Sequence, residues 1–164
     1  MAGEALAAAD LEHLRAAIAV SREAAARGDE PYGAVLVDAS GRLLLAAGNT
    51  QNSTGDCTGH AETNLLREAT TRFGAQALAG STLYASGEPC AMCAGAIYWS
   101  GVPRVVFALP AARMNAIAGE RTDVLDLDSR EVLARGQHAV TVLGPVLEDE
   151  AAEVLEAHYG AQRA

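Results

Sequence analysis

The chain has 164 residues, half of them hydrophobic, which suits one globular domain with its own core and excludes a largely disordered protein. Its 12 basic residues are all arginine and are outnumbered by 21 acidic residues, so the formal charge is −9. Because an acidic surface repels phosphate groups, this composition argues against a nucleic-acid partner.

The N-terminal residues and the cysteines indicate the cellular compartment in which the protein is found. Residues 1–6 lack the basic start and apolar run of a secretory signal, and no stretch approaches the ~18 apolar residues of a membrane span. The three cysteines are an odd number and offer no disulfide framework. We therefore expect a cytoplasmic protein with no membrane contact.

Apolar spacing and turn residues divide the chain into short alternating elements. In chain order these are a helix from Asp10 to about Gly28, strands at 35–37 and 43–45, a polar loop at 49–59, a helix from His60 to about Glu68, a strand at 82–85, a helix at 90–99, a strand at 104–107, a helix at 111–117, a polar segment at 119–128, a helix at 129–134, a strand at 140–142 and a last helix over 147–158. This order implies an α/β fold, a three-layer α/β/α sandwich around a mixed five-stranded sheet. No repeat or linker divides residues 1–164, so we expect a single domain.

Two short motifs at predicted helix starts carry the chemistry. The first is H-A-E at residues 60–62, and the second is P-C-A-M-C at residues 89–93. Catalytic zinc sites use three protein ligands and leave the fourth position to water. His60, Cys90 and Cys93 match that set, and the pattern H-x-E…P-C-x-x-C is typical of zinc nucleobase deaminases. We predict one zinc ion per subunit.

Glu62 is predicted to be the catalytic acid and base. It lies two residues past His60, so on a helix it cannot share the face of a ligating His60 and can point at the metal-bound water. There it would take the proton of the water, pass it to a ring nitrogen and protonate the leaving ammonia. Cys90 follows a proline at a helix start, where the helix dipole favours thiolate, and Cys93 lies one turn further on.

Over about residues 31–109 the chain resembles the cytidine and deoxycytidylate deaminase superfamily, in particular its small purine and tRNA deaminases. Residues 31–37 (P-Y-G-A-V-L-V) are similar to the first strand of the family, and residues 56–62 (D-C-T-G-H-A-E) to its D-P-T-A-H-A-E motif. Residues 86–99 (S-G-E-P-C-A-M-C-A-G-A-I-Y-W) look most like guanine deaminases. The resemblance implies a cytidine deaminase-like fold and a homodimer.

Two parts of the chain depart from the family pattern. Cys57 and Gly59 stand where a proline and an alanine are usual, and residues 108–115 follow neither the guanine nor the tRNA deaminase pattern. We expect Cys57 to be a loop residue, because a fourth thiolate ligand would displace the water that reacts. In this family the loop at 108–115 and the C-terminus usually complete the base pocket.

The resemblance also suggests substrate contacts. The predicted substrate-binding residues are Asn49, Tyr32, Ala61 and Trp99. Asn49 matches a family asparagine that bonds the substrate ring or sugar, although asparagine is also common in turns. The two aromatic residues lie beside the motif segments and could equally be ordinary core residues.

The predicted reaction is hydrolytic deamination of a free purine base, guanine to xanthine and ammonia, by a hydrolase that acts on the C–N bonds of cyclic amidines. One alternative is a tRNA adenosine deaminase that produces inosine. Another is a deaminase of cytosine, cytidine or a different amino-heterocycle, which residues 101–104 (G-V-P-R) also suggest. An RNA substrate would need arginines around the pocket mouth and would bind less tightly as salt rises. The expected partner is therefore a small nucleobase or nucleoside.

Overall fold

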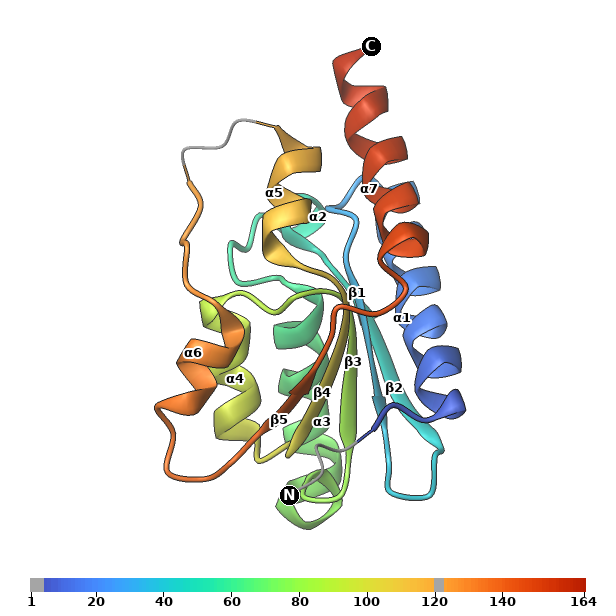
Figure 1. The fold of residues 1–164 in the computed structure, drawn as a ribbon. Coiled ribbons are helices and arrows are strands. Elements are labelled where there is room, and N and C mark those ends of the chain that lie inside the picture. Colours follow the sequence, from blue (N-terminus) through green and yellow to red (C-terminus); the bar gives the residue numbers. More distant parts are fainter. Residues whose placement is uncertain (1–4, 120–122) are drawn as a thin grey trace.

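The computed structural model describes residues 5–119 and 123–164, and it has a sheet between two layers of helices (Figure 1). The helices are α1 (Ala8–Ala26), α2 (Gln51–Thr54), α3 (Ala61–Leu78), α4 (Ala91–Ser100), α5 (Ala111–Ala118), α6 (Ser129–Ala134) and α7 (Glu148–Arg163). The strands are β1 (Gly33–Val37), β2 (Leu43–Gly48), β3 (Thr82–Gly87), β4 (Arg104–Leu109) and β5 (Thr141–Leu143). The predicted three-layer sandwich with a mixed five-stranded sheet is confirmed.

The direction of the strands gathers several loops at one end of the sheet. The strand order is β2-β1-β3-β4-β5. β1 is antiparallel to β2 and to β3, whereas β3, β4 and β5 are parallel. As a result Gly33 pairs with Gly48, and Gly87 with Leu109, at the same end of the sheet. The segments that lead into α3, α4 and α5 all leave from this end (Figure 1).

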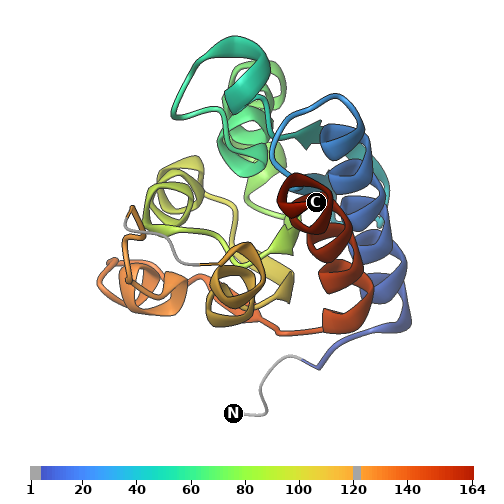
Figure 2. The ribbon, with the colours of Figure 1, turned by 90° about the horizontal axis from the view of Figure 1, so that it is seen from above.

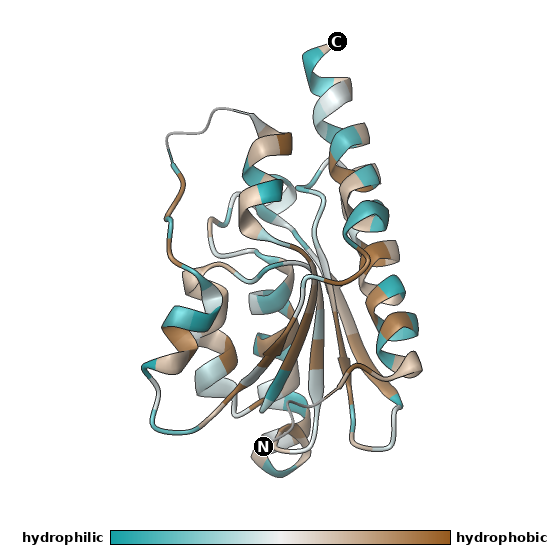
Figure 3. Cartoon of the chain, in the orientation of Figure 1, coloured by the Kyte–Doolittle hydropathy of each residue, from teal (hydrophilic) through white to brown (hydrophobic). Residues whose placement is uncertain are grey.

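Each face of the sheet is covered by a different pair of helices, as the view from above shows (Figure 2). On one face α1 and α7 pack around buried Ile18, Val106 and Leu155. On the other face α3 and α4 pack around Leu65 and Ile97. Successive side chains of a strand point to opposite faces, so strands buried on both sides are nearly continuous apolar runs. Figure 3 shows these apolar strands between helices that carry both hydrophilic and hydrophobic residues.

The helix that follows the first zinc motif is longer than its sequence pattern predicts. α3 was expected to end near Glu68 but continues to Leu78. Its later turns are held by burial, because Ala69 and Leu78 are almost completely shielded from solvent. The break falls instead at Gly74, where φ is 76°, a left-handed value that glycine adopts without strain.

Smaller differences lie in the loops and at the ends. The segment at 49–59, predicted as a polar loop, contains the short helix α2. Asp10 lies inside the first turn of α1, where its Oδ2 accepts a hydrogen bond from the N–H of Ala7 at 2.7 Å. The first four residues of segment 1–6 and three residues of the polar segment 119–128 lie outside the described residues. Among the described helices, none has the length and apolar character needed to cross a membrane.

Candidate metal centre

The predicted metal ligands come from the starts of two helices at the same end of the sheet. His60 is the N-cap of α3, and Cys90 is the N-cap of α4, both with extended backbone dihedrals. Cys93 lies within the first turn of α4. α4 follows β3 directly and α3 follows the loop after β2, so both helices begin where those strands end. The fold thus joins two motifs that are about thirty residues apart in the sequence.

The distances between the donor atoms fit a tetrahedral zinc ion. Nδ1 of His60 lies 3.5 Å from Sγ of Cys90 and 3.5 Å from Sγ of Cys93. Zinc binds imidazole nitrogen at about 2.0 Å and thiolate sulfur at about 2.3 Å, so tetrahedral geometry separates these donors by about 3.5 Å. All three donor atoms lie within 4.8 Å of one another. The residues therefore form a His/Cys/Cys zinc site, and Cys57, which is exposed, is not part of this group.

The carboxylate of Glu62 lies inside the same site. Glu62 belongs to the first turn of α3 and is only 6% exposed. Its Oε2 accepts a hydrogen bond from Sγ of Cys93 at 3.4 Å. Burial raises the pKa of Glu62, because a carboxylate loses hydration in these surroundings. A carboxyl group with a pKa moved toward neutral can both accept and release a proton during turnover.

The two thiols differ in their affinity for a proton. A hydrogen bond with Cys93 lowers the pKa of Cys90 to about 4, against the opposing effect of burial. The same hydrogen bond and burial raise the pKa of Cys93. These opposite shifts favour a thiolate at Cys90 and a thiol at Cys93. The start of a helix adds further stabilisation for the Cys90 thiolate, which is the form of cysteine that binds a metal ion.

The loop that presents His60 is braced from the next turn of α3. Nδ2 of Asn64 donates to the carbonyl oxygen of Gly48 at 3.0 Å and to Oγ1 of Thr50 at 2.9 Å. Gly59 lies in the crowded part of this loop, since a side chain there would begin 2.8 Å from Oγ1 of Thr50. A glycine at position 59, where the family motif usually has alanine, therefore fits the local packing. The sequence prediction missed Asn64, although its position four residues after His60 could have indicated a role.

Three of the four predicted substrate contacts lie at this end of the sheet. Asn49 is 1% exposed and bonds Gln51 twice: its Nδ2 donates to Oε1 at 2.8 Å, and its Oδ1 accepts from the backbone N–H at 2.9 Å. Ala61 is the first residue of α3. Tyr32 lies just before β1, with its Cδ1 3.4 Å from the point where a side chain at Gly87 would begin. Their contact with a substrate stays a prediction.

Trp99 is not brought to the zinc ligands. It lies near the C-terminal end of α4, about 13 Å beyond Cys90 at a rise of 1.5 Å per residue. Its side chain is 83% exposed and packs edge-on against Tyr98, at 5.3 Å between ring centroids. This position does not favour contact with a substrate bound in the same chain.

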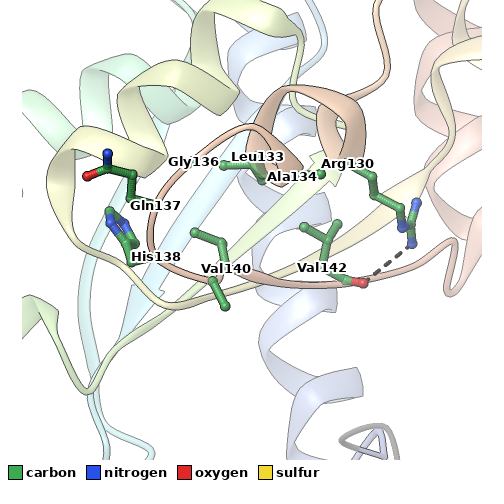
Figure 4. Close-up of a pocket in the computed structure, with 9 residues that line it drawn as sticks. Arg130, Leu133, Ala134, Gly136, Gln137, His138, Val140 and Val142 are labelled. Atoms are coloured by element: carbon green, nitrogen blue, oxygen red, sulfur yellow. Dashed lines mark hydrogen bonds between the residues drawn. The ribbon is translucent and has the colours of Figure 1, made fainter.

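A separate cavity of about 510 Å³ lies between α6 and β5 (Figure 4). Its lining includes Leu133, His138, Val140 and Val142. Nη2 of Arg130 donates across it to the carbonyl oxygen of Val142, at 3.5 Å. The residues that line this cavity include neither a zinc ligand nor a predicted substrate contact, so it is distinct from the metal centre.

Known proteins share both the motif region and the fold of this chain. Residues 8–109 match the cytidine and deoxycytidylate deaminase zinc-binding region. A probable cytosine deaminase of Schizosaccharomyces pombe is 40% identical over 154 residues, which cover 92% of this chain and 93% of the relative. A tRNA-specific adenosine deaminase of Bacillus subtilis is 33% identical over 147 residues, or 90% of this chain and 86% of the relative.

The fold is similar to that of a solved deaminase structure. A guanine deaminase from Nitrosomonas europaea superposes with a TM-score of 0.79 at 27% identity. The match covers 96% of this chain and 87% of the other.

Proposed function

Because the chain belongs to the cytidine and deoxycytidylate deaminase zinc-binding family, we propose that it deaminates a free amino-substituted nucleobase, with cytosine as the first candidate. The protein is a zinc deaminase, a hydrolase that acts on C–N bonds, and its zinc site consists of His60, Cys90 and Cys93. The observation that carries the proposed reaction is the buried carboxylate of Glu62, 3.4 Å from a ligand sulfur.

Glu62 performs the proton transfers in this proposal. A zinc ion in such a site lowers the pKa of water from 15.7 to about 7 and supplies a nucleophile at neutral pH. Glu62 accepts one proton from the attacking water and delivers it to the ring nitrogen. It then accepts the second proton of that water from the newly added hydroxyl group and delivers it to the amino group, which leaves as ammonia while the carbonyl group forms. The products are the oxo-substituted base and ammonia. Burial suits Glu62 to this work, because the loss of hydration raises the pKa of the carboxyl group and so increases its affinity for a proton.

Three residues are proposed to hold the base against this carboxylate. Ala61 begins α3, and its backbone N–H has no partner within the helix, so it can donate to a carbonyl oxygen of the base. The side-chain NH2 group of Asn49 donates one hydrogen bond to Gln51, and its second N–H can donate to the substrate. The ring of Tyr32 supplies an apolar surface beside Gly87.

Cytosine is placed first because of the extent of similarity. The Schizosaccharomyces pombe relative, a probable cytosine deaminase, aligns over 92% of this chain. Such an alignment extends past Leu109 into the segments that flank the site, where residues 108–115 fitted neither the guanine nor the tRNA deaminase pattern. The original prediction of guanine thus becomes the second candidate.

Guanine keeps support from the fold and from one motif. The superposition on the Nitrosomonas europaea guanine deaminase extends over nearly the whole chain. Residues 86–99 also look most like guanine deaminases.

An RNA substrate is disfavoured by the way the arginines are paired. The arginines of the described chain that lie within 4.0 Å of a carboxylate are Arg15, Arg27, Arg42, Arg72, Arg104, Arg113 and Arg135. Arg113, on α5, lies 3.5 Å from Glu148 and 2.9 Å from Asp149 at the start of α7. Neutralised arginines contribute little to phosphate binding, which depends on uncompensated positive charge.

The substrate proposal is tested by ammonia release from zinc-loaded protein. Cytosine, guanine, cytidine, adenosine and an adenosine-containing tRNA stem-loop are compared at equal concentration. We expect cytosine to have the highest kcat/KM, with cytidine at least about tenfold lower, a difference of about 1.4 kcal/mol. A clear preference for guanine would make guanine, and not cytosine, the first candidate substrate. Activity on the stem-loop alone would refute the proposal that the substrate is a free base.

The outer face of α4 supports a proposed homodimer. Met92 and Trp99 are 37% and 83% exposed on this face, and a side chain at Gly95 would meet no atom within 4 Å. An apolar helix face with a small residue at its centre allows close approach of a second copy. A cytoplasmic location is also proposed, because the thiols of Cys90 and Cys93 must stay reduced to bind zinc.

A further inference from the structure

Glu88 stands between β3 and the zinc-binding helix, yet its carboxylate is directed at other segments. Its backbone N–H donates to the carbonyl oxygen of Leu109 at 2.8 Å and joins the ends of β3 and β4. Its Oε2 accepts from the N–H of Ala111 at 3.0 Å, and its Oε1 accepts from Oγ of Ser129 at 2.9 Å. Both partners follow β4 in the sequence, and each is the first residue of a helix.

The contact with Ala111 caps α5 from outside the helix. Pro110 is the N-cap of α5 and makes no side-chain cap. The first N–H groups of a helix lack partners within it, and a negative charge is favourable at this positive end of the dipole. Glu88 supplies both the acceptor and the charge. It therefore fixes where α5 begins relative to Cys90, only two residues away in the sequence.

The contact with Ser129 fixes α6 to the same carboxylate. Ser129 is 1% exposed, so its hydroxyl needs a partner inside the protein. α6 in turn packs against α4. Two helices that follow β4 thus share one anchor next to the zinc-binding segment.

α5 carries a side chain into the space beside the zinc loop. Sδ of Met114 lies 2.5 Å from the point where a side chain at Gly87 would begin, and Tyr32 lies 3.4 Å from the same point. A side chain at position 87 would have to displace this sulfur. Met114 and Tyr32 therefore form an apolar wall beside Gly87, three residues before Cys90, and the position of this wall depends on α5.

We propose that Glu88 is a positioning residue that holds α5 and α6 in register with α4 and so sets the apolar wall of Met114 and Tyr32 against the bound base. The proposal rests on the proposed function for the identity of the ligand, but not for the anchoring itself. Glu88 needs no proton transfer and no contact with the metal in this role.

The kinetic test compares Glu88→Ala with Glu88→Gln. Glu88→Ala should keep one zinc per chain and raise KM about tenfold, equivalent to about 1.4 kcal/mol, while kcat changes less than about threefold. Glu88→Gln should restore KM to within about threefold, because an amide can accept from Ala111 and donate to Ser129. Glu131→Gln, on the exposed side of α6, is the matched control and should match the unaltered protein.

A second readout requires no substrate. In Glu88→Ala, backbone amides at the start of α5 should exchange with deuterium about tenfold faster, whereas amides of α3 should not change. Ser129→Ala removes only the hydroxyl group that donates to Glu88 and should accelerate exchange in α6 alone. This variant replaces Glu88→Ala in the test if Glu88→Ala folds poorly. Unchanged exchange in α5 would overturn the proposal, as would loss of zinc from folded Glu88→Ala. If no base is turned over, the exchange result still decides the role of Glu88.

Discussion

At the scale of single residues, we propose that the site separates metal binding from proton transfer. His60, Cys90 and Cys93 direct their donor atoms at one point, with both nitrogen–sulfur distances at 3.5 Å. Glu62 lies beside them and is buried, but it is not needed as a fourth ligand. The fourth position of a zinc ion held by these three residues would be open to water, which distinguishes a catalytic from a structural zinc site.

Replacement of Glu62 should uncouple these two roles. Glu62→Gln has nearly the same shape but cannot carry a proton between water and base. We expect one zinc per chain, an unchanged fold and a kcat lower by at least about 10²-fold, as for loss of general acid–base catalysis. Zinc content by elemental analysis and kcat from ammonia release are measured together. Turnover close to that of the unaltered protein would remove Glu62 as the proton carrier.

Replacement of Cys93 should remove the metal instead. Cys93→Ser should lose zinc and, with it, the stabilisation that binding gives to the native state, about 2.7 kcal/mol at a zinc concentration of 100 times Kd. Thermal unfolding with and without zinc measures this: the unaltered protein should show a rise in Tm, and the variant none. Cys57→Ser is the matched control, because Cys57 is exposed and outside the cluster. A full complement of zinc in Cys93→Ser would refute the ligand assignment.

At the scale of elements, a buried ion pair joins α1 to the sheet at the end remote from the zinc loops. Asp10 accepts from Arg104 at 2.8 Å and 2.9 Å and from the hydroxyl of Tyr84 at 2.6 Å. The side chains of Asp10 and Arg104 are 5% and 13% exposed. The bonds from Arg104 and Tyr84 hold the pKa of Asp10 well below its usual range. This pair fixes the helix on which the α1–α7 layer is built.

The pKa of Asp10 makes a part of the stability depend on pH. Since the pKa is lower in the folded chain, the stabilisation is present above about pH 4 and is lost as the pH falls below the unfolded value of about 3.9. Asp10→Asn should lower the free energy of unfolding at pH 7 by about 3 kcal/mol, as for a broken buried pair. It should also flatten the fall in stability between about pH 5 and pH 2.

Urea unfolding at several pH values measures both effects. Glu12→Gln, an exposed position on the same helix, is the control. An unaltered pH dependence in Asp10→Asn would show that other carboxylates dominate acid unfolding.

The elements differ in how far the sequence predicts them. The strands and the two motif helices follow from apolar runs and from turn residues close by in the chain. The end of α3 does not, because tertiary burial of Leu78 extends it beyond its local pattern. The zinc ligands were predictable because His60 and the cysteines occur in two characteristic motifs. The role of Glu88 was not, since its partners lie 23 and 41 residues further along the chain.

At the scale of the whole molecule, we expect surface charge to influence which substrates bind, and an apolar helix face to influence whether a second copy of the chain binds. The net charge of −9 and the paired arginines favour a small neutral base over a polyanion. We propose that residues 1–164 act as one domain that pairs with a second copy through α4. The exposed apolar face of α4 is the feature that a partner copy would cover.

A charge placed on this face should prevent the pairing. Trp99→Asp should convert a dimer into a monomer in light scattering at micromolar concentration, because an unpaired charge in an apolar interface is costly. Leu125→Asp, at another exposed apolar position, should stay dimeric. A monomeric unaltered protein, or a dimer that survives Trp99→Asp, would contradict an interface at α4.

We propose that the His60–Cys90–Cys93 site turns over an amino-substituted base with one zinc ion. The most direct measurement is ammonia release from cytosine as metal-free protein is titrated with zinc, together with the same titration of Glu62→Gln. We expect a rate that rises in proportion to zinc and levels off at one ion per chain, and we expect Glu62→Gln to bind the ion but to remain inactive. Deamination by the metal-free protein, or equal activity in Glu62→Gln, would contradict this proposal.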